Sequence, residues 1–170
     1  MMIIGAPGMT GSDAAVDFAA FFGAEYERLF QSLYLLCGNK ADAEDLAQET
    51  MARAFERWDR VVAAETPTGY IFQIGFNLHR SMLRRARRAL TGGSRVAVKA
   101  EPNLGQTRLE VLEALSSLPA AQRQALVLVE WLGFSAEEAG HILRIAPSSV
   151  RGRLHRVRGS LRETFGGIDA

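Results

Sequence analysis

A segment near the end of the chain, residues 144–162, carries side chains that could bind DNA. It contains six arginines and no acidic residue. Guanidinium groups bind phosphates and the edges of guanine, and small residues allow a helix to approach the bases of the major groove closely. The alternative is a solvated basic helix packed on a core. The residues that we expect to contact DNA are Ser148, Ser149, Arg151, Gly152, Arg153, His155 and Arg156.

A second basic segment, residues 80–95, also holds six arginines and no acid. Phe72, Phe76 and His79 lie off the inner apolar stripe expected for this helix, next to the arginines. Aromatic rings beside guanidinium groups suit melted nucleic acid, because unpaired bases stack on the rings while phosphates pair with arginine. The pattern equally allows these side chains to complete a second packing face.

An acidic segment precedes both basic ones, since residues 13–59 hold ten acidic and four basic residues. Asp45, Gln48 and Glu49 form a polar edge past the first turns of a predicted helix, where the helix dipole no longer accounts for acids. Blocks of opposite charge indicate nucleic acid for the basic parts and another partner for the acidic part. Neither a metal site nor a catalytic carboxylate pair is indicated, so we expect no catalytic residue, no metal and no cofactor.

The composition predicts a packed cytoplasmic protein. Hydrophobic residues make up 48% of the 170 residues, which is ample for a core. The single cysteine, Cys37, excludes an intramolecular disulfide and lies among leucines as an expected buried thiol. No apolar run reaches membrane-spanning length, and the first residues lack the basic start of a signal peptide, so no membrane insertion is expected.

The elements that position these residues read as helices throughout. We expect helices over 13–37, with a break at Gly23, and over 40–58, capped by Asn39 and with Phe55 facing the core. A loop over 61–66 precedes a helix from Pro67 to about Ala89, for which Thr66 is the expected cap. Residues 106–117 and 119–133 then supply two helices of a second unit.

The last two helices form a predicted helix-turn-helix. Ser135 and Glu138 have the spacing of a capping box, and Pro147 suits the first position of the second helix. The expected fold class is all-α, with two small helical domains, 13–90 and 106–166, joined by a flexible linker over 91–105 and preceded by a disordered stretch over 1–12. The buried stripe of the last helix is expected to be Val150, Leu154, Val157 and Leu161.

Four ordered motifs resemble the extracytoplasmic-function (group 4) sigma factors of bacterial RNA polymerase. They are Asp42-Ala-Glu-Asp-Leu-Ala-Gln-Glu-Thr-Met51, the run from Pro67 to Arg85, the Leu-Pro-x-x-Gln-Arg run ending at Arg123, and the helix-turn-helix. No single motif is decisive, since helix-turn-helix segments are common, but the ordered set over residues 13–165 is highly specific.

The resemblance implies a promoter-specificity factor without catalysis. Asp45, Gln48 and Glu49 would dock on the clamp helices of the largest subunit of core RNA polymerase. The C-terminal domain would read the −35 element through the DNA-contacting residues given above while it sits on the flap of the β subunit. An anti-sigma factor is a possible further partner. The −10 element of promoter DNA would be bound by Thr66, Asn77, Arg80, Arg84, Arg85 and Arg88.

Some positions depart from the family pattern. Arg144 stands where the turn usually has glycine, at a cost of about 1 kcal/mol if the residue must be left-handed. Gly152, Phe76 and Ser81 also differ from the residues usual in the family. These departures bear on which promoter sequence is recognised rather than on membership of the family. The alternative function is a helix-turn-helix regulator that binds an operator without polymerase; the acidic edge and the second basic segment argue against it.

Overall fold

The structure, a computed structural model, describes residues 11–90 and 105–165, and most of these residues are helical with no strand among them. The predictions for residues 1–10 and for most of the linker, 91–104, lie outside the described residues. The element order is α1 (Gly11–Cys37), α2 (Lys40–Glu56), α3 (Trp58–Ala63), α4 (Pro67–Ala89), α5 (Gln106–Ser117), α6 (Ala120–Leu126), a π-helical turn η1 (Val127–Trp131), α7 (Ala136–Leu143) and α8 (Pro147–Phe165). The all-α class is confirmed.

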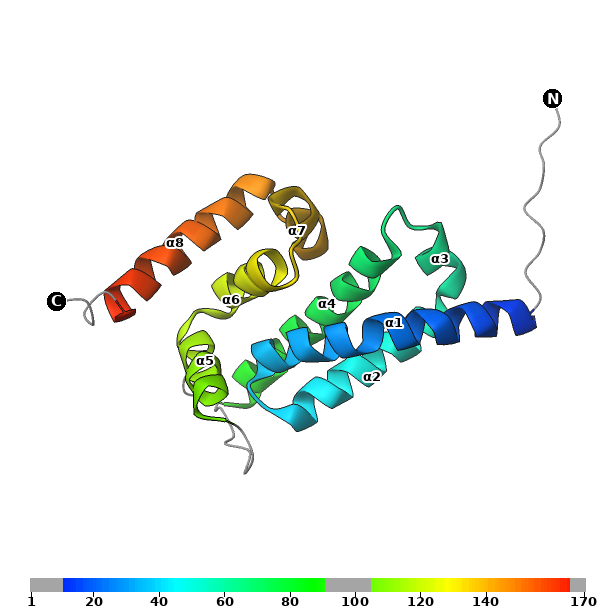
Figure 1. Cartoon of the computed structure of the whole chain (residues 1–170), viewed down its shortest axis with the longest axis horizontal. Helices are drawn as coiled ribbons and strands as arrows, with labels where there is room; N and C mark the ends of the chain where they lie inside the picture. The colour runs from blue at the N-terminus through cyan, green and yellow to red at the C-terminus, as the bar shows by residue number, and fades with distance from the viewer. Residues whose placement is uncertain (1–10, 91–104, 166–170) are drawn as a thin grey trace.

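The N-terminal unit consists of α1 to α4. The long α1 packs against α2, and α4 lies across both (Figure 1). Asn39 caps α2 as predicted, because its side-chain oxygen accepts a hydrogen bond from the Asp42 amide at 2.9 Å. Gly38 supplies the preceding turn with a φ of 72°, a left-handed conformation that glycine adopts without strain.

Four expectations for this unit are wrong. Gly23 does not break α1, because one exposed glycine costs only about 1 kcal/mol and the packing of the helix outweighs it. Residues 61–63 continue a short helix, α3, since Trp58 and Val61 are buried. Thr66 precedes α4 without a side-chain cap bond. Phe55, expected in the core, is 53% exposed and touches only the edge of the Phe18 ring among the aromatic contacts described.

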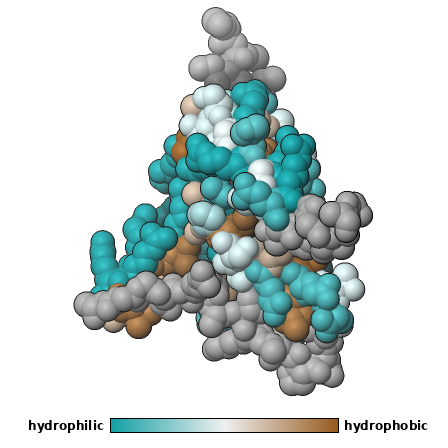
Figure 2. Space-filling model, turned by 90° about the vertical axis from the view of Figure 1, so that its left-hand side faces the viewer, coloured by the Kyte–Doolittle hydropathy of each residue, from teal (hydrophilic) through white to brown (hydrophobic). Residues whose placement is uncertain are grey.

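The C-terminal unit consists of α5 to α8, with α8 packed on α6 and α7. Hydrophilic side chains cover much of the face at the α5 and α8 end, with smaller hydrophobic areas between them (Figure 2). The predicted stripe of α8 is buried at Val150, Leu154 and Val157, while Leu161 is only partly buried. Cys37 is buried as expected, and burial raises the pKa of its thiol to about 12.

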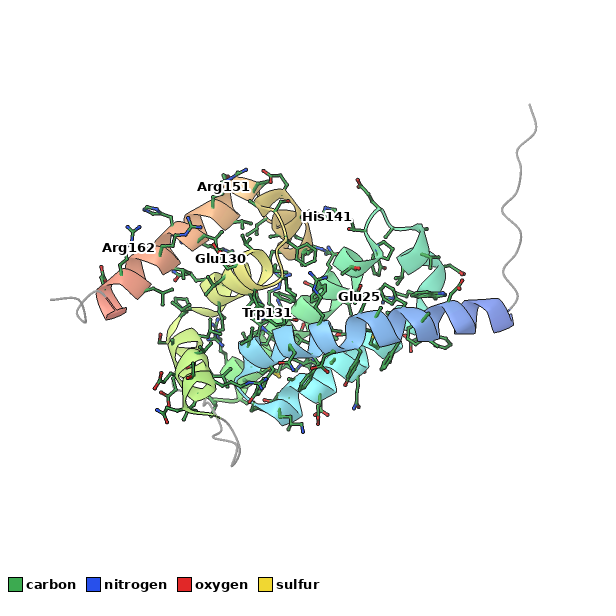
Figure 3. All side chains as sticks on the ribbon, in the orientation of Figure 1. Glu25, Glu130, Trp131, His141, Arg151 and Arg162 are labelled. Atoms are coloured by element: carbon green, nitrogen blue, oxygen red, sulfur yellow. The ribbon has the colours of Figure 1, made fainter. Side chains whose placement is uncertain are left out.

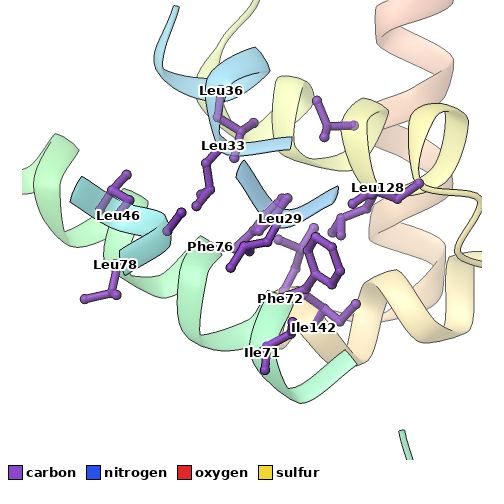
Figure 4. Packing of buried hydrophobic residues seen from close by; sticks show 14 of the residues in the cluster. Leu29, Leu33, Leu36, Leu46, Ile71, Phe72, Phe76, Leu78, Leu128 and Ile142 are labelled. Carbon is purple, nitrogen blue, oxygen red and sulfur yellow. The ribbon is translucent and has the colours of Figure 1, made fainter. Parts of the chain in front are cut away.

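The core is continuous between the two units. Leu29 of α1 and Phe72 of α4 gather with Leu128 of η1 and Ile142 of α7 (Figure 4). All four side chains are at most 2% exposed. The two helical units of the described chain therefore lie directly against each other.

Candidate functional site

The helix-turn-helix has the cap and the turn that the sequence predicts. The Ser135 hydroxyl accepts a bond from the Glu138 amide at 3.1 Å, and the Glu138 carboxylate accepts one from the Ser135 amide at 2.8 Å. Arg144 takes the left-handed conformation, with φ 56° and ψ 46°. The chain turns so tightly that a Cβ on Gly140 would lie 2.8 Å from the Ile145 carbonyl oxygen. The turn therefore depends on a glycine at 140 and tolerates strain at 144.

The outer face of α8 presents the side chains predicted to bind DNA. Ser148, Ser149, Arg151, His155 and Arg156 are exposed, and Gly152 and Arg153 are partly buried. Figure 3 shows Arg151 and Arg162 at the two ends of this helix.

Two arginines of α8 are already paired with carboxylates, Arg151 and, through Glu130 at 3.0 Å, Arg158. Arg151 makes a short ion pair with Glu137 of α7. Burial, and then the nearby Arg156, lower the pKa of Arg153. Exposed ion pairs contribute little and exchange readily with other anions, so Arg151 can pass from Glu137 to a DNA phosphate.

The residues of α4 and of the loop before it that were predicted to bind DNA fall into two groups. Thr66, Arg84, Arg85 and Arg88 are exposed, whereas Asn77 and Arg80 are half-buried. Arg80 makes a short hydrogen bond to the Asn77 side chain and donates to the Leu143 carbonyl oxygen of α7 at 3.2 Å. Burial lowers the pKa of Arg80, and so do the neighbouring charges of other arginines. The structure thus brings Arg80 against the C-terminal unit rather than into solvent.

The aromatic side chains of α4 belong to a second packing face. Phe72, Phe76 and His79 are all 0% exposed. The Phe72 ring meets Phe134 edge-on, with centroids 5.6 Å apart, and the His79 Nδ1 lies 3.2 Å from the Gln124 amide nitrogen. The sequence left open whether these side chains stack on unpaired bases or complete a second packing face. In this structure they form a second packing face.

The acidic edge of α2 is an exposed strip. Asp45, Gln48 and Glu49 are exposed while Leu46 beneath them is buried. Glu49 also pairs with Arg53 at 2.7 Å. A groove of about 420 Å³ runs beside this edge, with Leu78, Met82 and Arg85 of α4 on its other side. The edge therefore combines carboxylates with apolar surface, which is a combination suited to a protein partner.

A second cleft joins the two units at the α3–α4 loop. It has a volume of about 340 Å³ and is lined by Glu65 and Thr66 on one side and by Glu137 and His141 of α7 on the other. One predicted DNA residue, Thr66, thus faces the helix-turn-helix.

Sequence reasoning missed the residues that hold the units together. Arg28 of α1 and Arg123 of α6 donate hydrogen bonds between the units, to the carbonyl oxygens of Leu132 and Leu36 at 2.6 Å each. Arg123 stands in a recognised motif, but its buried position was not foreseeable from the apolar periodicity. From the sequence alone, Arg28 is indistinguishable from an ordinary exposed basic residue in an acidic segment.

Within residues 11–90 and 105–165, no cluster of histidine, cysteine and carboxylate side chains could hold a metal ion. In the same part of the chain, no helix is both long enough and apolar enough to cross a membrane.

Comparison with known proteins gives consistent matches in both units. The family Sigma-70 region 2 matches residues 21–89, and the family Sigma-70, region 4 matches residues 108–161. The ECF RNA polymerase sigma factor EcfG of Rhodopseudomonas palustris is 38% identical over 133 residues, which cover 74% of this chain and 72% of that relative. SigE, an ECF RNA polymerase sigma factor of Mycolicibacterium smegmatis, is 37% identical over 165 residues, which cover 91% of this chain and 64% of that protein.

A solved structure is similar over both units. The sigma factor RpoE of Bartonella quintana, in complex with the anti-sigma factor NepR, superimposes with a TM-score of 0.72 at 25% identity, covering 86% of this chain and 95% of that one.

Proposed function

Given that this chain belongs to the extracytoplasmic-function sigma factors of bacterial RNA polymerase, we propose how its surfaces divide the work of a promoter-specificity factor. Sigma factors bind core polymerase and direct it to promoters, and they act as regulatory subunits rather than enzymes. In this chain, Asp45, Gln48 and Glu49 bind the clamp helices of the largest subunit. The exposed carboxylates above a buried Leu46, next to an apolar groove, support this assignment.

The two basic surfaces then bind promoter DNA. Region 2, which we place at residues 13–90, takes the −10 element through α4 and the loop before it. Region 4, placed at 106–166, takes the −35 element through the exposed face of α8 and rests on the β flap. The matches to residues 21–89 and 108–161 support this division, with residues 91–105 as the linker.

Further partners follow from the class. The neighbouring RpoE structure contains an anti-sigma factor, and we propose that an anti-sigma factor binds this chain as well. The chain itself performs no catalysis and works in the cytoplasm, where the polymerase is. The observation that carries the proposal is the presence of three separate exposed surfaces on one chain: the acidic edge of α2, the basic end of α4 and the arginine face of α8.

The direct test is reconstitution. We expect the purified chain to form a complex with core polymerase and to start transcription at a defined set of promoters that share −10 and −35 sequences. A chain that bound duplex DNA tightly but never bound core polymerase would instead be an operator-binding regulator.

Substitution of Arg156 tests the reading of the −35 element. Arg156 is exposed on α8, where its guanidinium group can reach a base edge. Arg156→Ala should therefore cost about 1–3 kcal/mol at one promoter position and relax specificity there. Arg151→Ala, at an exposed arginine that holds Glu137, should weaken binding equally for all −35 variants. Affinity measured over single-base −35 variants distinguishes the two, and a uniform loss for Arg156→Ala would show that this arginine binds a phosphate.

Neutralising the exposed end of α4 tests the −10 surface. The triple variant Arg84→Gln, Arg85→Gln and Arg88→Gln should reduce promoter opening and flatten its salt dependence, because fewer counterions are released when fewer guanidinium groups meet phosphates. The melting temperature should barely move, since all three side chains are exposed. Permanganate footprinting checks the melted region, and normal reactivity at the −10 element would contradict the assignment.

A further inference from the structure

Arg144, in the turn of the helix-turn-helix, has a backbone conformation that disfavours any side chain. Its φ is 56°, and in the part of the chain that the structure describes, the other residues with a positive φ are glycines, Gly38 and Gly133. In a left-handed residue the Cβ lies too close to the following carbonyl oxygen, a contact that glycine avoids. An arginine at this position therefore destabilises the turn relative to glycine.

The left-handed conformation is fixed by the hydrogen bonds that end α7. The Ile145 amide donates to the Gly140 carbonyl oxygen at 2.9 Å, and the Arg144 amide donates to the His141 carbonyl oxygen at 3.3 Å. These two bonds form the Schellman motif, whose left-handed residue is usually glycine. Arg144 cannot leave this conformation without breaking the turn that sets α8 against α7, so the strain persists in the folded chain.

The guanidinium group of Arg144 is an uncompensated cation. The side chain is exposed, and among the described residues it has neither a carboxylate nor a hydrogen-bond acceptor as a partner. Its surroundings are positive as well, because the pKa of Arg80 in α4 is lowered first by burial and then by the charges of Arg84 and Arg144. An unpaired cation close to other cations favours the binding of an anion.

The position of the turn indicates which anion this is. In a helix-turn-helix, the N-terminal residues of the second helix contact base edges in the major groove, and the first helix crosses the sugar-phosphate backbone. Figure 1 shows α7 and α8 meeting at the outer edge of the C-terminal unit, and Arg144 comes shortly before Ser148, the first residue of α8 proposed to contact the −35 element. The turn therefore lies at the edge of the groove, beside the phosphates.

We propose that Arg144 binds a phosphate of the promoter backbone at the edge of the −35 element. The inference rests on the proposed function of α8. The contact between guanidinium and phosphate offsets the strain of the turn, and so an unfavourable residue occupies a position suited to glycine. A phosphate carries no sequence information, so Arg144 adds affinity for every promoter and leaves the preferred −35 sequence unchanged.

A purely structural role for Arg144 makes a different prediction. A cation near the C-terminal end of α7 interacts favourably with the dipole of that helix. If this interaction were the only benefit, replacement of Arg144 by a neutral residue would change stability and leave promoter binding as it is.

Three substitutions of Arg144 separate its charge from its conformation. Arg144→Gly and Arg144→Asn accept the left-handed conformation and carry no charge, whereas Arg144→Lys keeps the charge. The matched control is Arg57→Gln, at an exposed arginine between α2 and α3, which changes the net charge by as much as the neutral variants do. All four variants should keep the helical circular dichroism, and Arg144→Gly should melt no lower than the wild type.

The affinity of the reconstituted holoenzyme for a fluorescent promoter duplex tests the contact. The two neutral variants should bind about three- to tenfold more weakly, equally for all single-base −35 variants, and the slope of log affinity against log salt should be smaller by about 0.9. Arg144→Lys and Arg57→Gln should stay within about twofold of the wild type. Unchanged affinity and slope for the neutral variants, or a loss confined to one −35 base pair, would overturn the inference.

Neutral substitutions in the DNA backbone identify the phosphate. Methylphosphonate, which lacks the negative charge, replaces one phosphate at a time along the −35 element. One replacement at its edge should weaken binding of the wild type by about three- to tenfold and leave Arg144→Gly almost unaffected, because the coupling is lost once either partner is removed. Equal losses for both proteins at every phosphate would show that Arg144 binds none of them.

Failure of the proposed function would be visible separately. A wild-type chain that formed no complex with core polymerase would contradict the proposed function. The same methylphosphonate scan, made on the free chain with a duplex selected from random sequence, would then still decide whether Arg144 binds a phosphate.

Discussion

Replacement of Asp45 and Gln48 by alanine is expected to remove most of the affinity for core RNA polymerase while the fold stays intact. Both side chains are exposed and lie over a buried Leu46. A solvated strip would tolerate the change, since such substitutions move stability by less than about 0.5 kcal/mol. A charged group that a basic partner desolvates contributes far more, at about 2–5 kcal/mol for a buried pair.

The expected phenotype is therefore divided between stability and binding. The helical circular dichroism and the melting temperature should remain nearly unchanged. Affinity for core polymerase should fall at least tenfold, since each 1.4 kcal/mol is about one decade, and transcription should fall with it.

The control is Glu56→Ala with Asp59→Ala, two exposed acids of the same unit outside the proposed edge. This control variant should bind core polymerase as the wild type does. A pull-down in which the Asp45 and Gln48 variant also binds normally would remove this edge from the interface.

Local chemistry explains which parts of the fold could be predicted from the sequence. The Asn39 cap, the Ser135–Glu138 capping box and the buried stripe of α8 depend on residues close together in the chain, and all three are present. For Arg144 the sequence predicted only a cost of about 1 kcal/mol if this residue were left-handed, and the structure shows that it is, with a φ of 56°.

Features set by distant residues could not be predicted in this way. Whether Phe72 and Phe76 faced solvent or a second core depended on the position of the C-terminal unit, which sequence periodicity does not determine. The same holds for Arg80, whose partner at Leu143 lies 63 positions away. Phe55 fits the apolar period of α2, yet it is 53% exposed although Ala54 and Trp58 are buried, and its ring packs on the edge of the Phe18 ring.

His79 should make the chain sensitive to mild acid. Its ring is 0% exposed, and the Nδ1 atom lies 3.2 Å from the Gln124 amide nitrogen, which donates to a neutral imidazole. The pKa of His79 is lowered to about 4, first by burial and then by the positive charges of Arg123 and Arg80, with Asp42 acting in the opposite direction.

The direction of the pH effect on stability follows from the protonation of His79 in the unfolded and the folded chain. The unfolded chain takes up a proton at His79 near pH 6.5, whereas the folded chain resists protonation until about pH 4. The stability contributed by the neutral ring is thus fully present above pH 6.5 and is lost as the pH falls from 6.5 toward 4. Between pH 7.5 and 5.0 this amounts to about 2 kcal/mol of unfolding free energy.

Urea denaturation followed by circular dichroism at pH 7.5 and 5.0 measures this loss. Carboxylates also titrate over this range, so the informative quantity is the difference between variants. Glutamine does not titrate, so the unfolding free energy of His79→Gln should fall by about 2 kcal/mol less than that of the wild type between pH 7.5 and 5.0. The control is His155→Gln, at an exposed histidine of α8. Its unfolding free energy should fall on acidification by as much as that of the wild type. Equal acid sensitivity of His79→Gln and the wild type would show that the buried ring does not control the response.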